Sequence, residues 1–135
     1  MDRRQRRVIV AVDFDNTITS KDTFPEISAL RQGAKRVINT LVTEYGCCIL
    51  ILTCREGESA EAAKQFLHEN GIIFMHFNEN CQERVKYWNW DTRKLGADIY
   101  IDDKGFASYN FIDWDRMEYR LYELVKYIKS DMKEI

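Results

Sequence analysis

The sequence predicts an α/β fold of three layers, a mostly parallel Rossmann-like sheet with helices on both faces. Short apolar runs alternate along the chain with stretches of helical periodicity, and this alternation is typical of strands joined by helical crossovers. Residues 8–12 form a continuous apolar run rich in β-branched side chains, which indicates a parallel strand buried on both faces. The crossovers between such strands are expected to be right-handed.

Each element follows from the local pattern. Apolar runs predict strands over residues 8–12, 47–52, 72–77 and 98–101. Apolar side chains at helical spacing predict helices over residues 37–45, 59–69 and 117–128. Gly46 and Asn70-Gly71 are stop signals for the first two of these helices. Residues 14–31, which contain the single proline, indicate a turn and an irregular loop, and residues 78–96 fit neither period.

Composition places the chain among ordinary globular proteins. A length of 135 residues predicts one domain over residues 1–135, and 45% hydrophobic with 31% charged residues fits a packed core. The formal charge of −2 gives no general attraction to nucleic acid. No apolar run approaches the roughly 20 residues that span a membrane, and the start lacks the pattern of a signal peptide. We therefore expect a cytoplasmic protein without membrane partners.

The four cysteines are expected to be reduced thiols in that compartment. No C-x-x-C pair is present, so the sequence does not predict a zinc site. His68, late in a predicted helix, and His76, in a predicted strand, have no partner at a metal-binding spacing and are expected to be structural.

Polar side chains follow the predicted strands at the points where they end. In parallel sheets, ligands bind beyond the carboxyl ends of the strands, so topology should gather these side chains at one edge. They are Asp13, Asp15, Thr53, Asn78, Asp102 and Asp103.

The carboxylates of this set predict a magnesium site. Like charges repel at close range unless a cation lies between them, and carboxylate oxygens suit Mg²⁺. Asp102 is the expected ligand and Asp103 a supporting residue. Thr53 and the backbone N–H groups that follow it, including that of Cys54, could bind a phosphoryl group, and Arg55 could contact substrate. Lys94 is the expected active-site cation, with Arg93 and Lys86 as alternatives.

Together these parts match the requirements of phosphoryl transfer, namely a nucleophile, a metal, a cation and backbone donors. The four motifs in order resemble those of the haloacid dehalogenase-like superfamily, whose phosphatases use an aspartate nucleophile. They are residues 10–18 (VAVDFDNTI), residues 49–53 (ILILT), Lys94, and residues 99–103 (IYIDD).

The resemblance implies a Mg²⁺-dependent hydrolase of phosphate monoesters that works through an aspartyl-phosphate. It implies Asp13 as nucleophile and metal ligand, and Asp15 as general acid and base with its backbone carbonyl on the metal. Thr53 would bind the phosphoryl group, Lys94 would hold nucleophile and phosphate, and Asp102 would be the second carboxylate ligand. An acid at Asp15 favours a phosphatase over the transport ATPases and dehalogenases of the same superfamily.

Asn16, assigned to the phosphate-binding part of the motif, stands where the family usually has glycine; asparagine tolerates a left-handed backbone, so the turn should survive. Thr17 is assigned a supporting role. The segments between the motifs are too short for a cap domain, so the resemblance implies a capless member. Such members act on large substrates or use a neighbouring subunit as a lid. The substrate could therefore be a phosphorylated small molecule or a macromolecular phosphate ester, and the protein could form a homo-oligomer.

Two other classes of function remain alternatives. A phospho-accepting receiver domain also combines a parallel sheet with acids, a threonine and a lysine, but its acidic pair comes first and its phosphorylated aspartate ends a middle strand. Here the middle strand ends in Thr53. A catalytically silent interaction protein is the third hypothesis, and the complete acidic set argues against it. The aromatic residues Tyr87, Trp88 and Trp90 could stack on a base or sugar or pack over the sheet edge.

Overall fold

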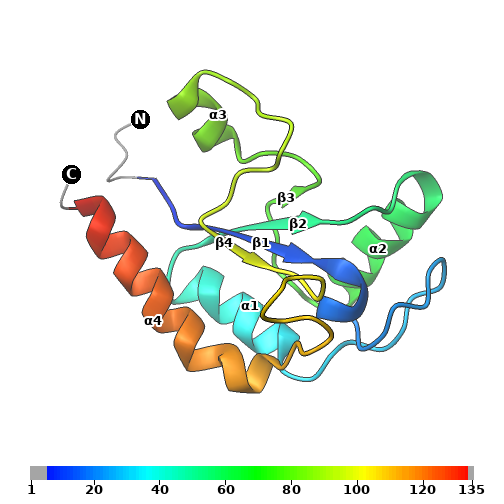
Figure 1. Cartoon of the computed structure of the whole chain (residues 1–135). Coiled ribbons are helices and arrows are strands. Elements are labelled where there is room, and N and C mark those ends of the chain that lie inside the picture. The colour runs from blue at the N-terminus through cyan, green and yellow to red at the C-terminus, as the bar shows by residue number, and fades with distance from the viewer. Residues whose placement is uncertain (1–5, 134–135) are drawn as a thin grey trace.

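The computed structural model describes residues 6–133 and shows one four-stranded parallel sheet in the order β3-β2-β1-β4 (Figure 1). β1 pairs with β2 on one side and β4 on the other, and β2 also pairs with β3. The α/β fold with a parallel sheet, predicted from the alternation of apolar runs and helical periods, is therefore confirmed. The strands are β1 Ile9–Asp13, β2 Cys48–Leu52, β3 His76–Phe77 and β4 Ile99–Ile101.

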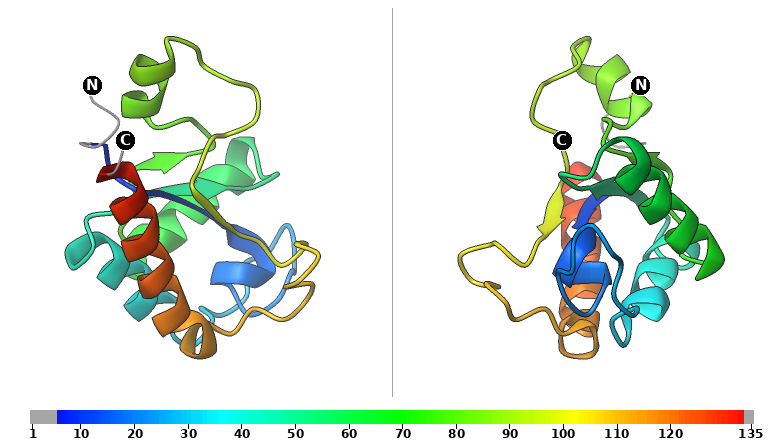
Figure 2. Two further views of the ribbon diagram at one scale, coloured as in Figure 1. Left: turned by 60° about the vertical axis from the view of Figure 1, so that its left-hand side comes forward. Right: turned by 90° about the vertical axis from the view of Figure 1, so that its right-hand side faces the viewer.

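The helices cover the two faces of the sheet unequally. Side chains at alternate strand positions, such as Val10 and Ile49, form the larger core with α1, α2 and α4. Ile9, Ala11 and Leu50 point to the opposite face, which is covered by the segment around α3, and Figure 2 shows α3 on the side away from α1 and α4. The helices are α1 Ala34–Thr43, α2 Gly57–Glu69, α3 Gln82–Trp88 and α4 Trp114–Lys133.

Two segments, residues 72–77 and residues 78–96, differ from the prediction. The strand expected over residues 72–77 pairs with β2 only at β3, although Ile72 is buried and the N–H of Met75 donates to the carbonyl of Ile49 at 2.9 Å. Residues 72–75 have the apolar pattern of a strand because most of their side chains pack on the core, although these residues do not form a regular strand pairing with β2. Residues 78–96, which fitted neither period, contain α3.

α4 begins earlier than expected and is tied to the turn that follows β1. Trp114, its first residue, is completely buried, and its indole N–H donates to the carbonyl of Thr17 at 2.9 Å. Gly33, directly before α1, has φ +83°, and a Cβ there would lie 2.7 Å from Asp115 Oδ1. The positive φ and the approach of Trp114 and Asp115 therefore favour glycine where the two helices meet. Within residues 6–133, none of the helices combines the length and apolarity needed to cross a bilayer.

Candidate functional site

An irregular turn, Phe14–Ile18, follows β1 and shapes one side of the candidate site, and Asp15 and Asn16 within it have non-helical backbone angles. Asn16 has φ 58° and ψ 16°, the left-handed conformation that asparagine adopts more readily than most residues. Its N–H donates to Thr19 Oγ1 at 2.9 Å, and Thr19 donates its own N–H to the carbonyl of Phe14 at 3.1 Å. Burial of Phe14 and Thr17 anchors the turn on the core. The chain thus leaves β1 with Asp13 fixed at the carboxyl edge of the sheet.

Three carboxylates meet at this edge, from the ends of two neighbouring strands. Asp13 ends β1, and Asp102 and Asp103 follow β4. One oxygen from each lies within 4.8 Å of the others. The prediction that sheet topology would gather these acids was thus correct for this trio, whereas the carboxylate of Asp15 is not part of it.

Hydrogen bonds from the turn after β1 hold the trio in place. Thr17 Oγ1 donates to Asp13 Oδ2 at 3.1 Å and accepts from the N–H of Asp103 at 3.1 Å, so one hydroxyl joins the ends of β1 and β4. Asn16 Nδ2 donates to Asp103 Oδ2 at 3.0 Å. The same oxygen of Asp103 lies 3.3 Å from Lys104 Nζ. Asn16 and Thr17 therefore position the carboxylates.

Burial above all raises the pKa of Asp13 to about 8, and the hydrogen bond to Asp103 and the charge of Asp102 act in the same direction. Because its charged form is destabilised, this carboxylate would be strongly stabilised by a nearby cation. Three converging carboxylate oxygens are the donors that a hard divalent ion prefers, so the residues present fit Mg²⁺. Asp13, Asp102 and Asp103 are the side chains that would hold it.

Asp15 faces a different partner, the guanidinium of Arg55. Its two oxygens accept from Arg55 Nε at 2.8 Å and from Nη2 at 2.7 Å. The side chain of Arg55 is only 1% exposed. It also donates to the carbonyls of Pro25 and Glu26, each at 2.9 Å. Arg55 thus connects the loop after β2, the turn after β1 and the irregular loop around residue 25.

The loop after β2 presents Thr53 and Cys54 to the site. The N–H of Thr53 donates to Asn78 Oδ1 at 2.8 Å, and the N–H of Arg55 donates to Thr53 Oγ1 at 3.1 Å. Within residues 6–133 the backbone N–H of Cys54 has no hydrogen-bond acceptor, and the residue is exposed. The N–H of Cys54 is therefore a donor available to a bound anion, in keeping with the role expected for this residue.

These residues line one open cavity of about 400 Å³ at the carboxyl edge of the sheet. The segment around residues 102–111 and the turn after β1 lie side by side at this end of the molecule (Figures 1 and 2). Of the side chains predicted for the site, those that line the cavity are Asp13, Asp15, Thr53, Cys54, Asn78, Asp102 and Asp103.

The structure does not bring Lys94 to the carboxylates. Lys94 is exposed, its Nζ lies 5.1 Å from the centre of the Tyr100 ring, and its neighbour Leu95 lines the cavity instead. The alternatives Arg93 and Lys86 are exposed and are not among the cavity residues either.

The basic side chain that lines the cavity is Lys104. Sequence reasoning missed it, and the available signal was its position directly after the acidic pair. A second omission was Arg31, which donates from Nη2 to the Asn16 carbonyl at 2.9 Å and to Asn16 Oδ1 at 2.8 Å. Arg31 lies in a loop without periodicity, so no pattern pointed to it.

Comparison with protein-family models and with curated proteins found no match to this chain. The chain is similar to a solved structure described as a conserved protein coded by a locus from Bacteroides thetaiotaomicron, with 26% sequence identity and a TM-score of 0.73. The superposition covers 87% of this chain and 92% of that chain. Because the likeness spans nearly all of both, the two proteins share the parallel-sheet α/β fold, which by itself does not set a reaction.

Proposed function

We propose that the protein is a Mg²⁺-dependent phosphatase that hydrolyses a phosphate monoester through an aspartyl-phosphate on Asp13. The observation that carries this proposal is the trio of carboxylates, Asp13, Asp102 and Asp103, at the edge of a parallel sheet and on the wall of an open cavity. The resemblance of the four motifs to the haloacid dehalogenase-like phosphatases supports the same reaction.

Bound between these carboxylates, Mg²⁺ would supply charge neutralisation for the nucleophile and the phosphoryl oxygens. An oxygen of Asp13 attacks phosphorus, and the bond from phosphorus to the leaving oxygen breaks as that oxygen takes a proton from Asp15. Water then attacks the phosphoryl group, Asp15 takes its proton, and the bond between phosphorus and Asp13 breaks. The Thr53 hydroxyl and the Cys54 N–H hold the phosphoryl oxygens during both steps.

Arg55 controls the second carboxylate in this scheme. Both oxygens of Asp15 accept hydrogen bonds from Arg55, which fixes the direction of the carboxylate, and each oxygen keeps a second lone pair that can carry the proton to the leaving group. The cation at the phosphoryl group in this structure would be Lys104, with Lys94 requiring a shift of its segment to reach it.

Hydrolysis of an aryl phosphate with Mg²⁺, with and without EDTA, tests the proposal. We expect turnover that depends on Mg²⁺ and falls by at least about 1000-fold in Asp13→Asn, since the nucleophile is lost. Asp131→Asn, an exposed residue of α4, is the matched control and should keep full activity. Turnover in Asp13→Asn or in EDTA would contradict the mechanism. Phosphorylation of Asp13 without turnover would instead indicate a receiver-type domain.

Asp15→Asn separates the two chemical steps. An aryl leaving group departs with little need of a proton, so the first step should persist, while water is no longer deprotonated in the second. The phosphorylated protein should therefore accumulate in this variant, and intact-protein mass spectrometry after an acid quench would detect it. Equal turnover in Asp15→Asn and the unaltered protein would exclude Asp15 as general base.

A further inference from the structure

A second cluster of metal-binding side chains lies on the sheet face opposite α1 and α4. Cys48 belongs to β2, His76 to β3, and Cys81 directly precedes α3. One ligand atom from each residue lies within 4.8 Å of the others. The register pairs Leu50 with His76, so His76 lies on the same face as Cys48 and close to it. The cluster is built on two adjacent strands and on the segment that follows them.

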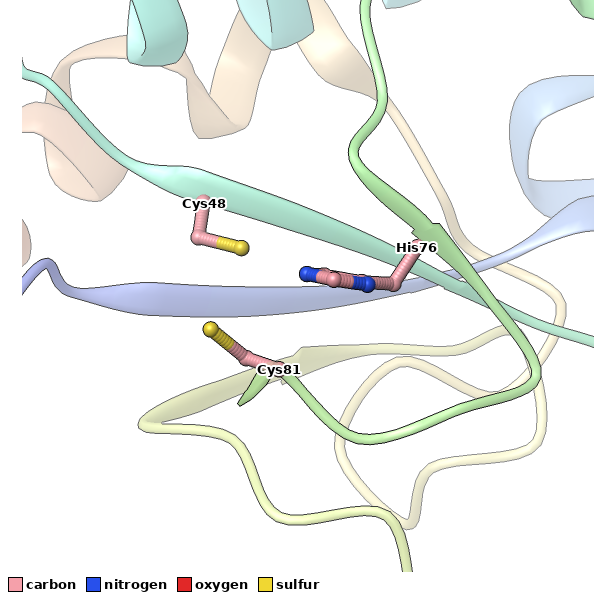
Figure 3. A group of neighbouring side chains, drawn as sticks. All are labelled: Cys48, His76 and Cys81. Atoms are coloured by element: carbon pink, nitrogen blue, oxygen red, sulfur yellow. The ribbon is translucent and has the colours of Figure 1, made fainter. Parts of the chain in front are cut away.

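The side chains are aimed at one another. Figure 3 shows both sulfur atoms and one end of the His76 ring directed into the same space. Nδ1 of His76 lies 3.3 Å from Glu79 Oε1, a contact that leaves Nε2 as the ring nitrogen toward the thiols. A carboxylate on the remote nitrogen is the usual partner of a metal-bound histidine, because it fixes the tautomer and the ring orientation.

The spacing suits a tetrahedral site. Zn–S distances of about 2.3 Å and Zn–N distances of about 2.0–2.1 Å place ligand atoms about 3.5–3.8 Å apart. Separations of at most 4.8 Å are therefore closed by small side-chain rotations. Soft thiolates with imidazole select zinc, whereas the carboxylates at the other site select a hard ion. The two clusters thus suit different metals.

We propose that Cys48, His76 and Cys81 bind one zinc ion through the two thiolates and the imidazole Nε2, with water as the fourth ligand. Binding releases the two thiol protons to solvent. Cys48 and Cys81 are 0% and 1% exposed, so the ion would be shielded on the side of the sheet, and the half-buried His76 marks its entrance.

The site would attach the segment around α3 to the sheet. None of the residues of α3 is buried. Among the residues that the structure describes, the core on this face has five buried members, Ile9, Ala11, Cys48, Leu50 and Cys81, with Leu52, Met75, Leu95 and Ala97 partly buried against them. β3 contributes just two paired residues. A metal joining β2, β3 and the start of α3 would supply a link that apolar burial provides weakly here. The sequence did not reveal it because its ligands are far apart along the chain and form no C-x-x-C pair.

The full chain, produced with zinc in the medium and purified without chelator, tests the proposal by metal analysis. We expect about one zinc per chain that survives dialysis. Replacement of zinc by Co²⁺ should give the thiolate-to-cobalt charge-transfer absorption and the strong visible bands of a tetrahedral site. Cys48→Ala, Cys81→Ala and His76→Gln should each lose the metal, and Glu79→Gln should weaken zinc affinity about 10-fold.

Matched controls distinguish binding at this cluster from binding by any thiol, imidazole or carboxylate of the chain. Cys47→Ala removes an equally buried thiol that faces the opposite core, and His68→Gln removes the other histidine, so both should keep the zinc. Asp13→Asn should keep it too, because the acidic trio is a separate site. Circular dichroism of each variant reports folding, and the cobalt spectrum of the unaltered chain gives a result that depends on no variant.

Three results would overturn the proposal. The first is a cobalt spectrum of the unaltered chain without thiolate charge transfer. The second is zinc content that persists in Cys81→Ala or disappears in Asp13→Asn. The third is a Cys48–Cys81 disulfide in freshly purified protein, which would identify the pair as a redox couple rather than as ligands.

Discussion

At the scale of single residues, Asp13 carries the largest electrostatic cost described in the site. Burial, the hydrogen bond to Asp103 and the charge of Asp102 raise its pKa to about 8 from an ordinary value of 3.8. Asp103 behaves in the opposite way. Burial disfavours its charge, but hydrogen bonds from Asn16 and Asp13 outweigh burial and lower its pKa. Asp13 is therefore the member of this pair on which a proton is more stable.

The stability of the metal-free protein should therefore fall with pH in a defined window. Between about pH 4 and 8, native Asp13 keeps a proton that the unfolded chain has released, so the free energy of unfolding decreases as pH rises. Asp103 acts only below its ordinary pKa, outside this window. Thermal melts in EDTA should show a loss of a few kcal/mol from pH 5 to 8. Saturating Mg²⁺ or Asp13→Asn should flatten the profile, and a slope retained in Asp13→Asn would contradict the assignment.

Asn16 has a left-handed backbone conformation, and its side chain donates a hydrogen bond to Asp103 and accepts one from Arg31. Asn16→Ala should cost about 2–3 kcal/mol, because alanine is strained at φ 58° and the hydrogen bonds to Asp103 and Arg31 are lost. Asn16→Gly relieves the strain but not the loss of bonds, so it should cost about 1 kcal/mol less. Urea denaturation would compare the two, and equal costs would show that the backbone conformation contributes nothing.

At the scale of elements, the loop after β2 restrains the irregular loop around residue 25 through Arg55. In Arg55→Lys a single ammonium replaces the planar guanidinium that donates to Asp15 and to two backbone carbonyls. We therefore expect the free energy of unfolding to fall by roughly 2 kcal/mol. Hydrogen exchange over residues 22–28 should become faster in this variant. Lys64→Gln removes an exposed pair with Glu61 and the approach of Lys64 Nζ to the Phe77 ring, both far from this loop, so it should leave exchange over residues 22–28 unchanged.

The same elements show what the sequence could predict. Strands β1 and β2 are buried on both faces. Their apolar runs predicted where each strand ends, and this placed Asp13, at the end of β1, and Thr53, directly after β2, at one edge. Contacts between loops could not be predicted in this way. Three such features are the ion pair of Asp15 with Arg55, the position of Lys94 over the Tyr100 ring, and the position of Lys104 in the cavity wall. Each depends on how segments without periodicity fold back on the sheet, and no local sequence pattern predicts that.

At the scale of the whole molecule, we expect the free energy of local opening to be high where side chains are buried and low where they are exposed. β1 and β2 lie in the middle of the sheet with nearly every side chain buried, whereas α3 buries none. Amide hydrogen exchange should be slowest in the two central strands and should proceed through local opening over residues 82–96. Uniform exchange across the chain would contradict this division. Added zinc should slow exchange over residues 76–96, and least in the already protected β1, if the thiol and imidazole cluster binds it.

The lengths of the strands have a further consequence for self-association. The outer strands, β3 and β4, pair over two and three residues, while the five-residue strands lie inside. A foreign strand that approached either border would find a ladder too short to hold it, so the sheet offers little template for edge-to-edge polymerisation. The molecule thus keeps its most β-prone segments in the centre, where no other chain can pair with them.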